Sequence, residues 1–367
     1  MGEPQIYPID YVRVARALWS NELSGYSNQY LPRFESEFAK IAGTRFSCAV
    51  NSGTSAIYLA LAALNLPKGT QVAVSTYTNM ATFFPILQLG LIPVPIDIEN
   101  RNFNLDPDDL RSVINKKFGA IIVVHIFGKP ANMDAIMDIA QKNNVPVIED
   151  CAEAHGATYH GKLVGSFGIA GCFSFYANKI IGTGEGGAIS TSDEEFANTI
   201  CSMRSLSFGK VNKFLHDSDG FNFRMTNIQA AMGLSQISNL SKVLQQKSSI
   251  AEKYRVRLES NQNMLLPSSE RGSVTWMYHL TLKCGHERCR DGTINEMAKV
   301  GIELRPGFIP FSDQINILNK YKMSVRGTPV ASSVAKSAFY LPTSLKLKTR
   351  NIEKVCENLI NIVDRLH

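Results

Sequence analysis

Lys179 is the residue of this chain whose surroundings best suit covalent chemistry. It follows the strand-like run 171–174, and four glycines come soon after it, at positions 182, 184, 186 and 187. Glycines let the backbone approach another group closely, and a lysine held in such a site can lose its proton and form a Schiff base with an aldehyde. The alternative is an ordinary surface lysine. The glycine spacing fits neither a Walker loop nor a dinucleotide-binding fingerprint, which argues against a nucleotide-binding loop here.

Two further segments supply groups that such chemistry needs. Gly53, Thr54 and Ser55 open a predicted helix, where free N–H groups and the positive end of the helix dipole favour a phosphate. A plain helix cap is the alternative there. Asp150 follows an apolar strand and is suited to a protonated ring nitrogen, a metal, a ribose hydroxyl or a loop cap. With Lys179, these groups meet the needs of pyridoxal phosphate, because an ionised Asp150 would keep its ring nitrogen protonated.

Between residues 45 and 195, β-branched runs alternate with amphipathic stretches, which predicts an α/β fold with a mostly parallel sheet. Strands are expected at 71–76, 91–98, 119–127 and 144–150, and helices at 54–65, 80–90 and 133–144. In an open parallel sheet, ligands bind beyond the carboxyl ends of the strands. This rule selects Asn79, His125 and Asp150 as residues near a site.

The pattern changes after residue 225. It predicts one long helix over 226–260, a strand pair near 274–283, a helix near 292–300, a loop over 301–310 and a final helix near 350–366. The length of 367 residues suits two domains. We therefore predict a large domain with an N-terminal arm over 1–240 and a small domain over 241–367.

Composition and charge exclude several classes of protein. With 44% hydrophobic and 19% charged residues the chain is typical of globular proteins, and no window reaches the ~20 apolar residues of a membrane span. The net charge of +6 is spread along the chain, which argues against a nucleic-acid partner. Seven scattered cysteines indicate reduced thiols and a cytoplasmic location. Cys284, His286 and Cys289 lack the fourth ligand of a structural zinc site, so no metal is expected.

Four longer segments occur in a fixed order along the chain: NSGTSAIYLAL, VIEDCAEAHGA, YHGKLVGSFGIAGCFSFYANKIIGTGEGGAIS and FNFRMTNIQAAMGL. In this order and spacing they resemble the DegT/DnrJ/EryC1/StrS sugar aminotransferase family, over nearly the whole chain. The resemblance implies an aspartate aminotransferase-like fold, with a large domain around a mostly parallel seven-stranded sheet and a smaller C-terminal α+β domain. It also implies a pyridoxal-phosphate-dependent aminotransferase.

The same resemblance assigns roles to individual residues. It implies that Lys179 forms the Schiff base and carries the proton, and that Asp150 pairs with the ring nitrogen. It also implies a homodimer, because Asn222 would reach the phosphate of a neighbouring subunit's cofactor. The other candidates are Gly53, Thr54, Ser55, Asn79, Glu153 and Ser174 for the cofactor, and Tyr77, His155, Arg224 and Arg305 for the substrate.

The expected reaction moves the amino group of L-glutamate onto a keto sugar, leaving 2-oxoglutarate, for surface polysaccharide or lipopolysaccharide synthesis. EDCAEA, FNFRMTNIQAA and ELRPGF look most similar to the perosamine synthase group, which aminates C4 of a nucleotide-linked 4-keto-6-deoxy sugar. Two departures from that group stand out. Asn79 replaces a usual aromatic residue, and Phe311 stands near the place of a histidine.

STYTNMATFFPILQLG is similar to the enzyme that aminates C8 of the eight-carbon acid 8-keto-Kdo. Because that enzyme accounts for both departures, the first expectation is formation of 8-amino-3,8-dideoxy-manno-octulosonate, with the perosamine-type reaction as the alternative. An alternative of another class is a catalytically silent regulator that binds pyridoxal phosphate. The presence of both Asp150 and Lys179 argues against that alternative.

Overall fold

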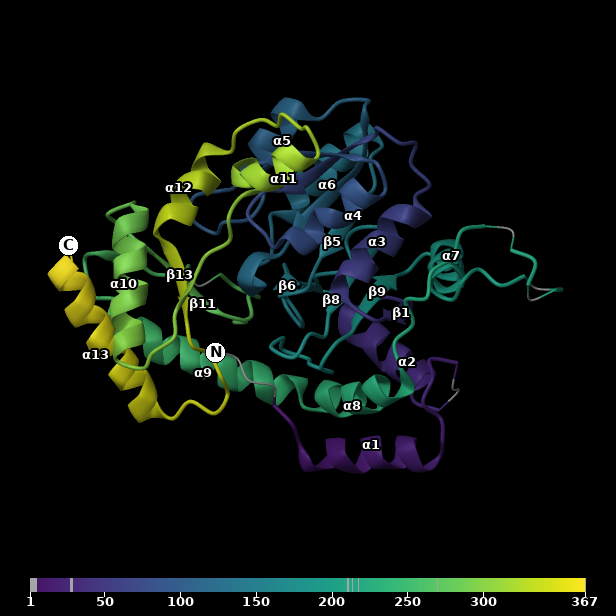
Figure 1. Cartoon of the computed structure of the whole chain (residues 1–367), viewed down its shortest axis with the longest axis horizontal. Helices are drawn as coiled ribbons and strands as arrows, with labels where there is room; N and C mark the ends of the chain where they lie inside the picture. The colour runs from purple at the N-terminus through teal and green to yellow at the C-terminus, as the bar shows by residue number, and fades with distance from the viewer. Residues whose placement is uncertain are drawn as a thin grey trace.

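A seven-stranded sheet forms the centre of the computed structural model, which describes residues 5–26, 29–209, 211–212, 214–216, 218–268 and 270–366 (Figure 1). The strand order is β1-β9-β8-β5-β4-β2-β3, and all neighbours are parallel except the two pairs that β9 makes. The strands are β1 (Phe46–Val50), β2 (Gln71–Ser75), β3 (Ile92–Ile96), β4 (Phe118–Val124), β5 (Val147–Asp150), β8 (Ala170–Ser174) and β9 (Gly187–Thr191). The predicted α/β class and mostly parallel sheet are confirmed.

Helices cover both faces of this sheet, which explains why its strands are nearly continuous apolar runs. Successive side chains of a strand point to opposite faces. Accordingly, Val72 and Val74 of β2 belong to one buried cluster and Ala73 belongs to another. The first cluster holds side chains of α3 (Gly53–Ala63), α4 (Phe84–Gln88) and α7 (Glu194–Arg204). The opposite face packs against α2 (Leu31–Ala42), α5 (Pro107–Val113), α6 (Met133–Asn143) and α8 (Asn227–Ser238).

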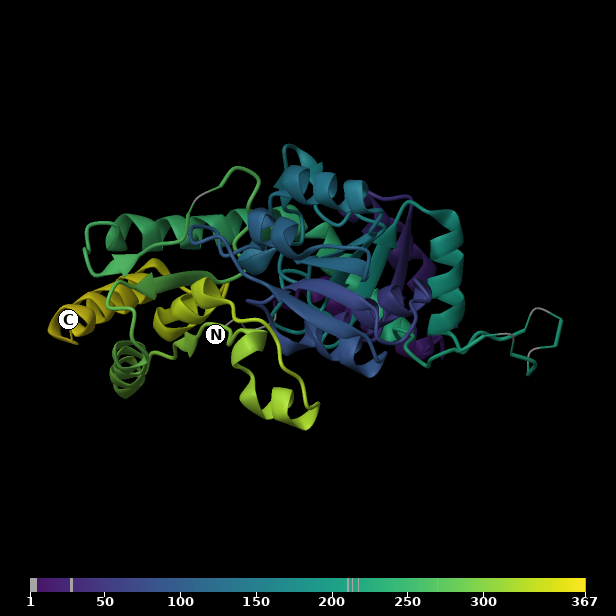
Figure 2. The ribbon, with the colours of Figure 1, turned by 90° about the horizontal axis from the view of Figure 1, so that it is seen from above.

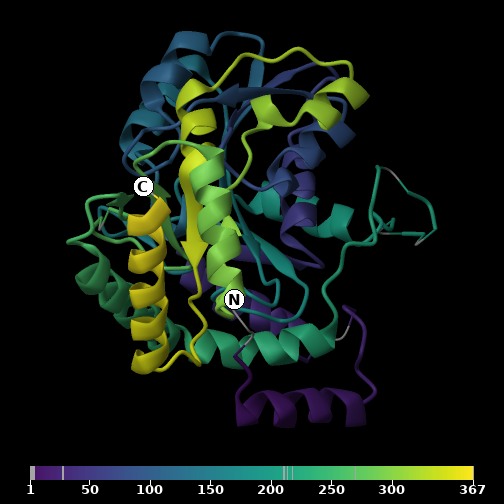
Figure 3. The ribbon, with the colours of Figure 1, turned by 60° about the vertical axis from the view of Figure 1, so that its left-hand side comes forward.

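The prediction of one long helix over 226–260 is wrong in one respect, because the helix is divided at Asn239. α8 ends at Ser238 and α9 runs over Leu240–Leu258, with Asn239 at φ −100° and ψ 0° between them. α1 (Pro8–Trp19) lies along α8, as Figures 1 and 3 show. The helix predicted over 80–90 is also shorter than expected. It consists of the 3₁₀ turn η1 (Met80–Thr82) followed by α4.

A second, antiparallel sheet of order β10-β11-β13-β12 packs against α9 and the last helices of the chain. The predicted strand pair near 274–283 is wrong, because this stretch holds one strand, which pairs with β10 and β13. The predicted division at residue 240 stays a prediction. The elements are β10 (Met264–Leu265), β11 (Tyr278–Leu282), β12 (Arg305–Pro306), β13 (Ala338–Leu341), α10 (Glu287–Lys299), α11 (Ile315–Lys320), α12 (Pro329–Ser337) and α13 (Thr349–Leu366).

Three short elements complete the described fold: the hairpin of β6 (Thr158–Tyr159) and β7 (Lys162–Leu163), and the 3₁₀ turns η2 (Ile126–Gly128) and η3 (Phe311–Asp313). Within the described part of the chain, every helix is too short or too polar to cross a bilayer.

The C-terminal segment is anchored to the first sheet by packing and by hydrogen bonds. Phe311 is fully buried and stacks on Phe83, with ring centroids 4.2 Å apart and an interplanar angle of 7°. Asp97, at the end of β3, accepts hydrogen bonds from the N–H groups of Val330 and Ala331 in the first turn of α12. The part of the chain that follows β11 is thereby held against the seven-stranded sheet.

The stacked pair gives a stability prediction. Phe311→Ala should lower the free energy of unfolding by about 3–5 kcal/mol, because it leaves a cavity in a packed core. Tyr11→Ala is the control, since Tyr11 is 68% exposed on α1, and a change within about 0.5 kcal/mol is expected there. Denaturant-induced unfolding of both variants checks this. Equal losses in the two variants would contradict the anchoring role of Phe311.

Candidate active site

A cavity of about 350 Å³ lies beyond the carboxyl ends of β4, β5 and β8, and the C-terminal segment forms its opposite wall. We call it the active cavity. Trp276, Phe308 and Tyr340 line it from the C-terminal side. Of the residues predicted from the sequence, the structure brings Gly53, Thr54, Asn79, Asp150, Glu153, Ser174, Lys179 and Arg305 to its walls.

Asp150 ends β5 and presents a buried carboxylate to this cavity, with 5% of the residue exposed. Its Oδ2 accepts a hydrogen bond from the hydroxyl of Thr82 at 2.9 Å, and its Oδ1 accepts one from the N–H of Ala152 at 3.1 Å. Burial raises the pKa of Asp150, while these two hydrogen bonds and the charge of Lys179 oppose the rise. A protonated ring nitrogen facing this carboxylate would add an opposite charge and favour its ionised form.

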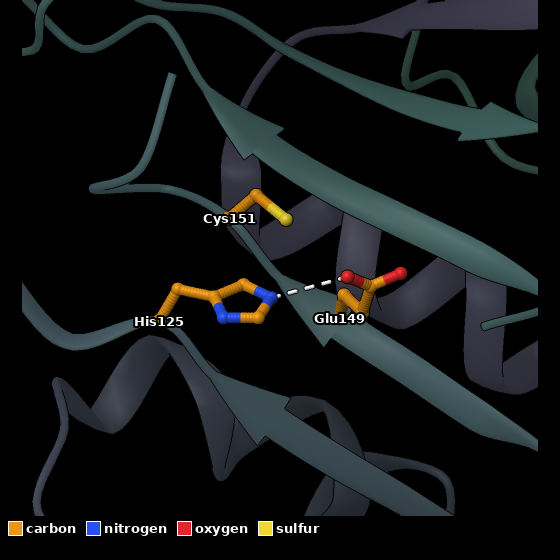
Figure 4. A group of neighbouring side chains, drawn as sticks. All are labelled: His125, Glu149 and Cys151. Carbon is orange, nitrogen blue, oxygen red and sulfur yellow. Dashed lines mark hydrogen bonds and ion pairs between the residues drawn. The ribbon is translucent and has the colours of Figure 1, made fainter. Parts of the chain in front are cut away.

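Glu149 precedes Asp150 on the same strand and points to the other face of the sheet. It forms a fully buried cluster with His125 and Cys151, whose ligand-type atoms lie within 4.8 Å of one another (Figure 4). His125 accepts a hydrogen bond from the N–H of Ala131 at Nδ1, so its Nε2–H donates to Glu149 at 3.1 Å. The other donors to Glu149 are the N–H groups of Gly165, Phe167 and Gly168. These bonds occupy both ring nitrogens of His125 and both carboxylate oxygens of Glu149, and they fix the end of β5.

Lys179 lies between a carboxylate and an aromatic ring. Its Nζ is 3.7 Å from Oε1 of Glu153 and 3.6 Å from the ring centroid of Trp276. Burial lowers the pKa of Lys179, and the charges of Glu153 and Asp150 oppose that change. Burial raises the pKa of Glu153 to about 7, against the charge of Lys179 and a hydrogen bond from the N–H of Phe127. A lysine in these surroundings loses its proton more readily than one in water.

The N-terminus of α3 forms a seat for a phosphate on the cavity wall. Ser52 caps the helix by accepting a hydrogen bond from the N–H of Ser55, which leaves the N–H groups of Gly53 and Thr54 without an intrahelical acceptor. Gly53 lies so close to Ser174 that a Cβ at this position would be 2.8 Å from the Cβ of Ser174. Two free amides, the dipole end of the helix and the Ser174 hydroxyl therefore converge where a phosphate fits. With Asp150 and Lys179, they match the three functional ends of pyridoxal phosphate.

Two of the predicted residues lie behind the cavity rather than on its walls. Tyr77 is fully buried, and its hydroxyl is 2.9 Å from Nε2 of His279. His155 is fully buried beside the rings of Phe173 and Phe175, and burial and the charge of Lys179 lower its pKa to about 3. His155 is therefore a neutral packed residue in this chain. Neither side chain is placed to touch a substrate in the active cavity.

Three more predicted residues lie outside the cavity of the single chain. The Ser55 hydroxyl is 2.9 Å from that of Ser52 and borders a separate hollow. The guanidinium of Arg224 lies over the ring of Tyr26. Asn222 is exposed and forms a backbone bridge with Ser205. Their predicted roles stay predictions.

Several residues that line the cavity were not predicted from the sequence, among them Thr82, Trp276, Tyr340 and Asn178. Thr82 lies in a 3₁₀ turn where the sequence predicts a regular helix, so nothing in the sequence indicates that its hydroxyl faces a cavity. Trp276 and Tyr340 come from the second sheet region, where periodicity gives no indication of which side chains face the first sheet. Asn178 directly precedes Lys179, and that adjacency could have drawn attention to it. Its carbonyl accepts a hydrogen bond from Trp276 Nε1 at 2.9 Å.

Comparisons with known proteins agree with this site. The model of the DegT/DnrJ/EryC1/StrS aminotransferase family matches residues 10–360. The chain is 34% identical to the GDP-perosamine synthase of Caulobacter vibrioides over 91% of this chain and 90% of that protein. It is 32% identical to the GDP-perosamine synthase of Escherichia coli O157:H7 over 94% of this chain and 93% of that protein. The solved aminotransferase from Psychrobacter cryohalolentis matches with a TM-score of 0.92 and 27% identity over 100% of this chain and 99% of that chain.

The match of a family model to almost the whole chain confirms the resemblance and the fold that the sequence predicted. The predicted cofactor is confirmed as well, because a Bacillus subtilis protein assigned as a pyridoxal phosphate-dependent aminotransferase is 34% identical over 77% of this chain and 74% of that protein. The chain therefore belongs to the DegT/DnrJ/EryC1/StrS aminotransferase family, and it is a pyridoxal-phosphate-dependent sugar aminotransferase.

Proposed function

We propose that this enzyme moves the amino group of L-glutamate onto a nucleotide-linked 4-keto-6-deoxy sugar for the synthesis of a surface polysaccharide. The observation that carries the aminotransferase part is one cavity that holds Lys179, whose side chain is 11% exposed, together with Asp150 and the phosphate seat of α3. The similarity to two GDP-perosamine synthases over nine tenths of the chain supports this class of sugar.

Pyridoxal phosphate, when bound, supplies a ring that draws electrons away from the carbon beside the amine. The Asp150 carboxylate would hold the ring nitrogen in its protonated form, and Thr82 would keep that carboxylate in place. Nζ of Lys179 would take the proton from the donor and return it to the acceptor. Glu153 would orient Nζ, and the wall of Trp276 would limit its movement and exclude water on that side.

A second candidate substrate is the free sugar acid 8-keto-Kdo, aminated at C8. Two features of the site favour it. Asn79 presents an amide in place of a ring, and its Oδ1 accepts a hydrogen bond from the N–H of Ala81. Phe311 is buried in the core of the first sheet and offers the substrate no polar group. Arg305 lines the cavity with its side chain 47% exposed, and it suits the carboxylate of this acid as well as the diphosphate of a nucleotide sugar.

We also propose that the active unit is a homodimer in which Asn222 reaches the cofactor phosphate of the neighbouring subunit. The described parts of the chain between α7 and α8, residues 205–209, 211–212, 214–216 and 218–226, extend away from the body of the chain (Figures 1 and 2). Their apolar side chains Phe214 and Leu215 are 79% and 63% exposed. Such side chains favour an interface that covers them.

The first test replaces the lysine. Lys179→Ala should lose the covalent attachment of the cofactor and all conversion of glutamate, because it removes the amine that bonds to the aldehyde. Mass spectrometry after borohydride reduction should find the cofactor on the peptide that carries position 179 in the native enzyme and in the control, but not in Lys179→Ala. Lys40→Ala is the control, since Lys40 is 66% exposed. Cofactor binding without glutamate-driven conversion in the native protein would indicate the silent regulator instead.

The second test separates the two substrates. Enzyme and glutamate are incubated with a 4-keto-6-deoxy nucleotide sugar or with 8-keto-Kdo, and the release of 2-oxoglutarate is measured. Faster release with the nucleotide sugar is expected. Release with 8-keto-Kdo alone would reject the proposed sugar and favour the second candidate, and release with neither would reject both.

The third test uses the pH dependence of Glu153. Because folding raises its pKa from 4.5 to about 7, the folded protein holds this proton more tightly than the unfolded chain does. The contribution of Glu153 to stability therefore falls as the pH rises from 4.5 to about 7. Glu153→Gln removes this titration, so the variant should gain thermal stability relative to the native cofactor-free protein across that window. Melting temperatures that run parallel at every pH would contradict this.

A further inference from the structure

A second cavity, of about 160 Å³, lies behind the active cavity and has no part in the chemistry described above. We call it the rear cavity. Thr275 and Met277 line it, whereas Trp276 between them lines the active cavity, so one stretch of backbone separates the two. The other residues that line the rear cavity come from η2 and the residue after it, from α9, from residues 267–268 and 270–275, and from β11.

Lys129 brings a buried ammonium group to this cavity. The residue is 5% exposed, and its Nζ has no hydrogen-bond partner among the described residues. Nζ lies 5.1 Å from the ring centroid of Phe103. The preceding Gly128, at φ +91°, lets the backbone pass so close to Val274 that a Cβ would be 2.3 Å from the Val274 carbonyl oxygen. A buried cation without an acceptor is unfavourable, which points to a bound anion.

His279 supplies a second donor. It is 1% exposed and its Nε2 is 2.9 Å from the hydroxyl of Tyr77. We assign the tautomer in which the Tyr77 hydroxyl donates to Nε2 of His279. The proton of the neutral imidazole is then on Nδ1, which has no partner among the described residues. Burial and the charge of Lys129 lower the pKa of His279, which keeps the ring neutral.

The other charged groups around the cavity limit what it can hold. Arg255 is already paired with Glu252 at 2.7 Å and with Glu259. Glu270 lines the cavity and accepts a hydrogen bond from the Ser268 hydroxyl, and its charge favours the protonated form of Lys129. The acidic side chains disfavour a large or highly charged anion. Two donors in a volume of about 160 Å³ suit one small group with two acceptor oxygens.

We propose that a small oxyanion, either a carboxylate or a phosphate, binds in the rear cavity between Nζ of Lys129 and Nδ1–H of His279. This site is separate from the substrate site and does not depend on the sugar proposed above. The Tyr77 hydroxyl lies 2.9 Å from Nε2 of His279 and so close to the backbone that a Cβ at Gly307 would be 2.1 Å from it, which joins the occupant to the segment that carries Phe308 of the active cavity.

Trp276 provides a direct readout of binding. The chain has two tryptophans, and Trp19 is 81% exposed at the end of α1. In a Trp19→Phe holoenzyme, emission comes from Trp276, whose ring stacks on Phe127 of the rear cavity wall at 6.3 Å. The holoenzyme is used because the cofactor then fills the phosphate seat of the active cavity. Titration with inorganic phosphate and, separately, with acetate at constant ionic strength should each be followed to saturation.

A saturable change in emission with at least one anion is expected. The anion that binds more tightly, phosphate or acetate, identifies the class of oxyanion that the cavity prefers. Lys129→Gln should weaken binding by about ten- to a hundredfold, the loss of one charge-assisted hydrogen bond. Lys142→Gln is the matched control and should bind as the parent does, because Lys142 is exposed and paired with Asp138. Glu270→Gln should tighten binding, since it removes a neighbouring negative charge.

The pH gives a further check. Because burial lowers the pKa of Lys129 to about 8, anion affinity should fall as the pH rises through 8 in the parent and stay level in Lys129→Gln. The melting temperature of Lys129→Gln should equal or exceed that of the parent, which shows that the variant is folded. No saturable response to either anion, or equal affinity in Lys129→Gln and the parent, would overturn the proposal.

Discussion

Two adjacent carboxylates at the end of a buried strand are the constraint on which the site depends. Because side chains alternate along a strand, Glu149 and Asp150 point to opposite faces of β5, and each must find partners inside the protein. Glu149 is satisfied by His125 and by backbone N–H groups of the 165–168 loop. Asp150 is satisfied by Thr82 and Ala152. The hydrogen bonds of Glu149 thus fix the end of β5 on the face away from the cavity, and those of Asp150 hold its carboxylate on the cavity side.

The opposite wall of the cavity comes from residues far along the chain, and it influences the pKa of Lys179. Trp276 covers Nζ of Lys179 at 3.6 Å and donates a hydrogen bond to the carbonyl of Asn178. The same wall excludes water, so the buried pair of Lys179 and Glu153 has pKa values displaced toward each other. A surface lysine at the same distance from a glutamate would keep its ordinary pKa. The second sheet therefore contributes to the reactivity of residues carried by the first.

The outcomes for particular residues show how far sequence reasoning extends. The apolar runs predict β2, β3, β4 and β5 well, because both faces of a parallel sheet are buried and the runs are nearly continuous. The rule for strand ends then selects Asp150 correctly for the cavity. The prediction of one helix over 226–260 fails, because the break at Asn239 involves a single residue and hardly changes the apolar period. Tyr77 and His155 have polar side chains near the motifs, but they are satisfied or packed behind the cavity.

The sequence by itself determined the α/β class and the cofactor, and it predicted the two residues that we propose act on that cofactor. These follow from local features: strand periodicity, a helix start at Gly53, and Asp150 and Lys179 at strand ends. Only the tertiary structure decided which side chains face the cavity, that Thr82 and Trp276 belong to it, and that Nζ of Lys129 lies in a second cavity with no hydrogen-bond partner among the described residues. The physical reason is that burial and charge compensation are set by neighbours distant along the chain, and a single sequence carries no signal of those pairings.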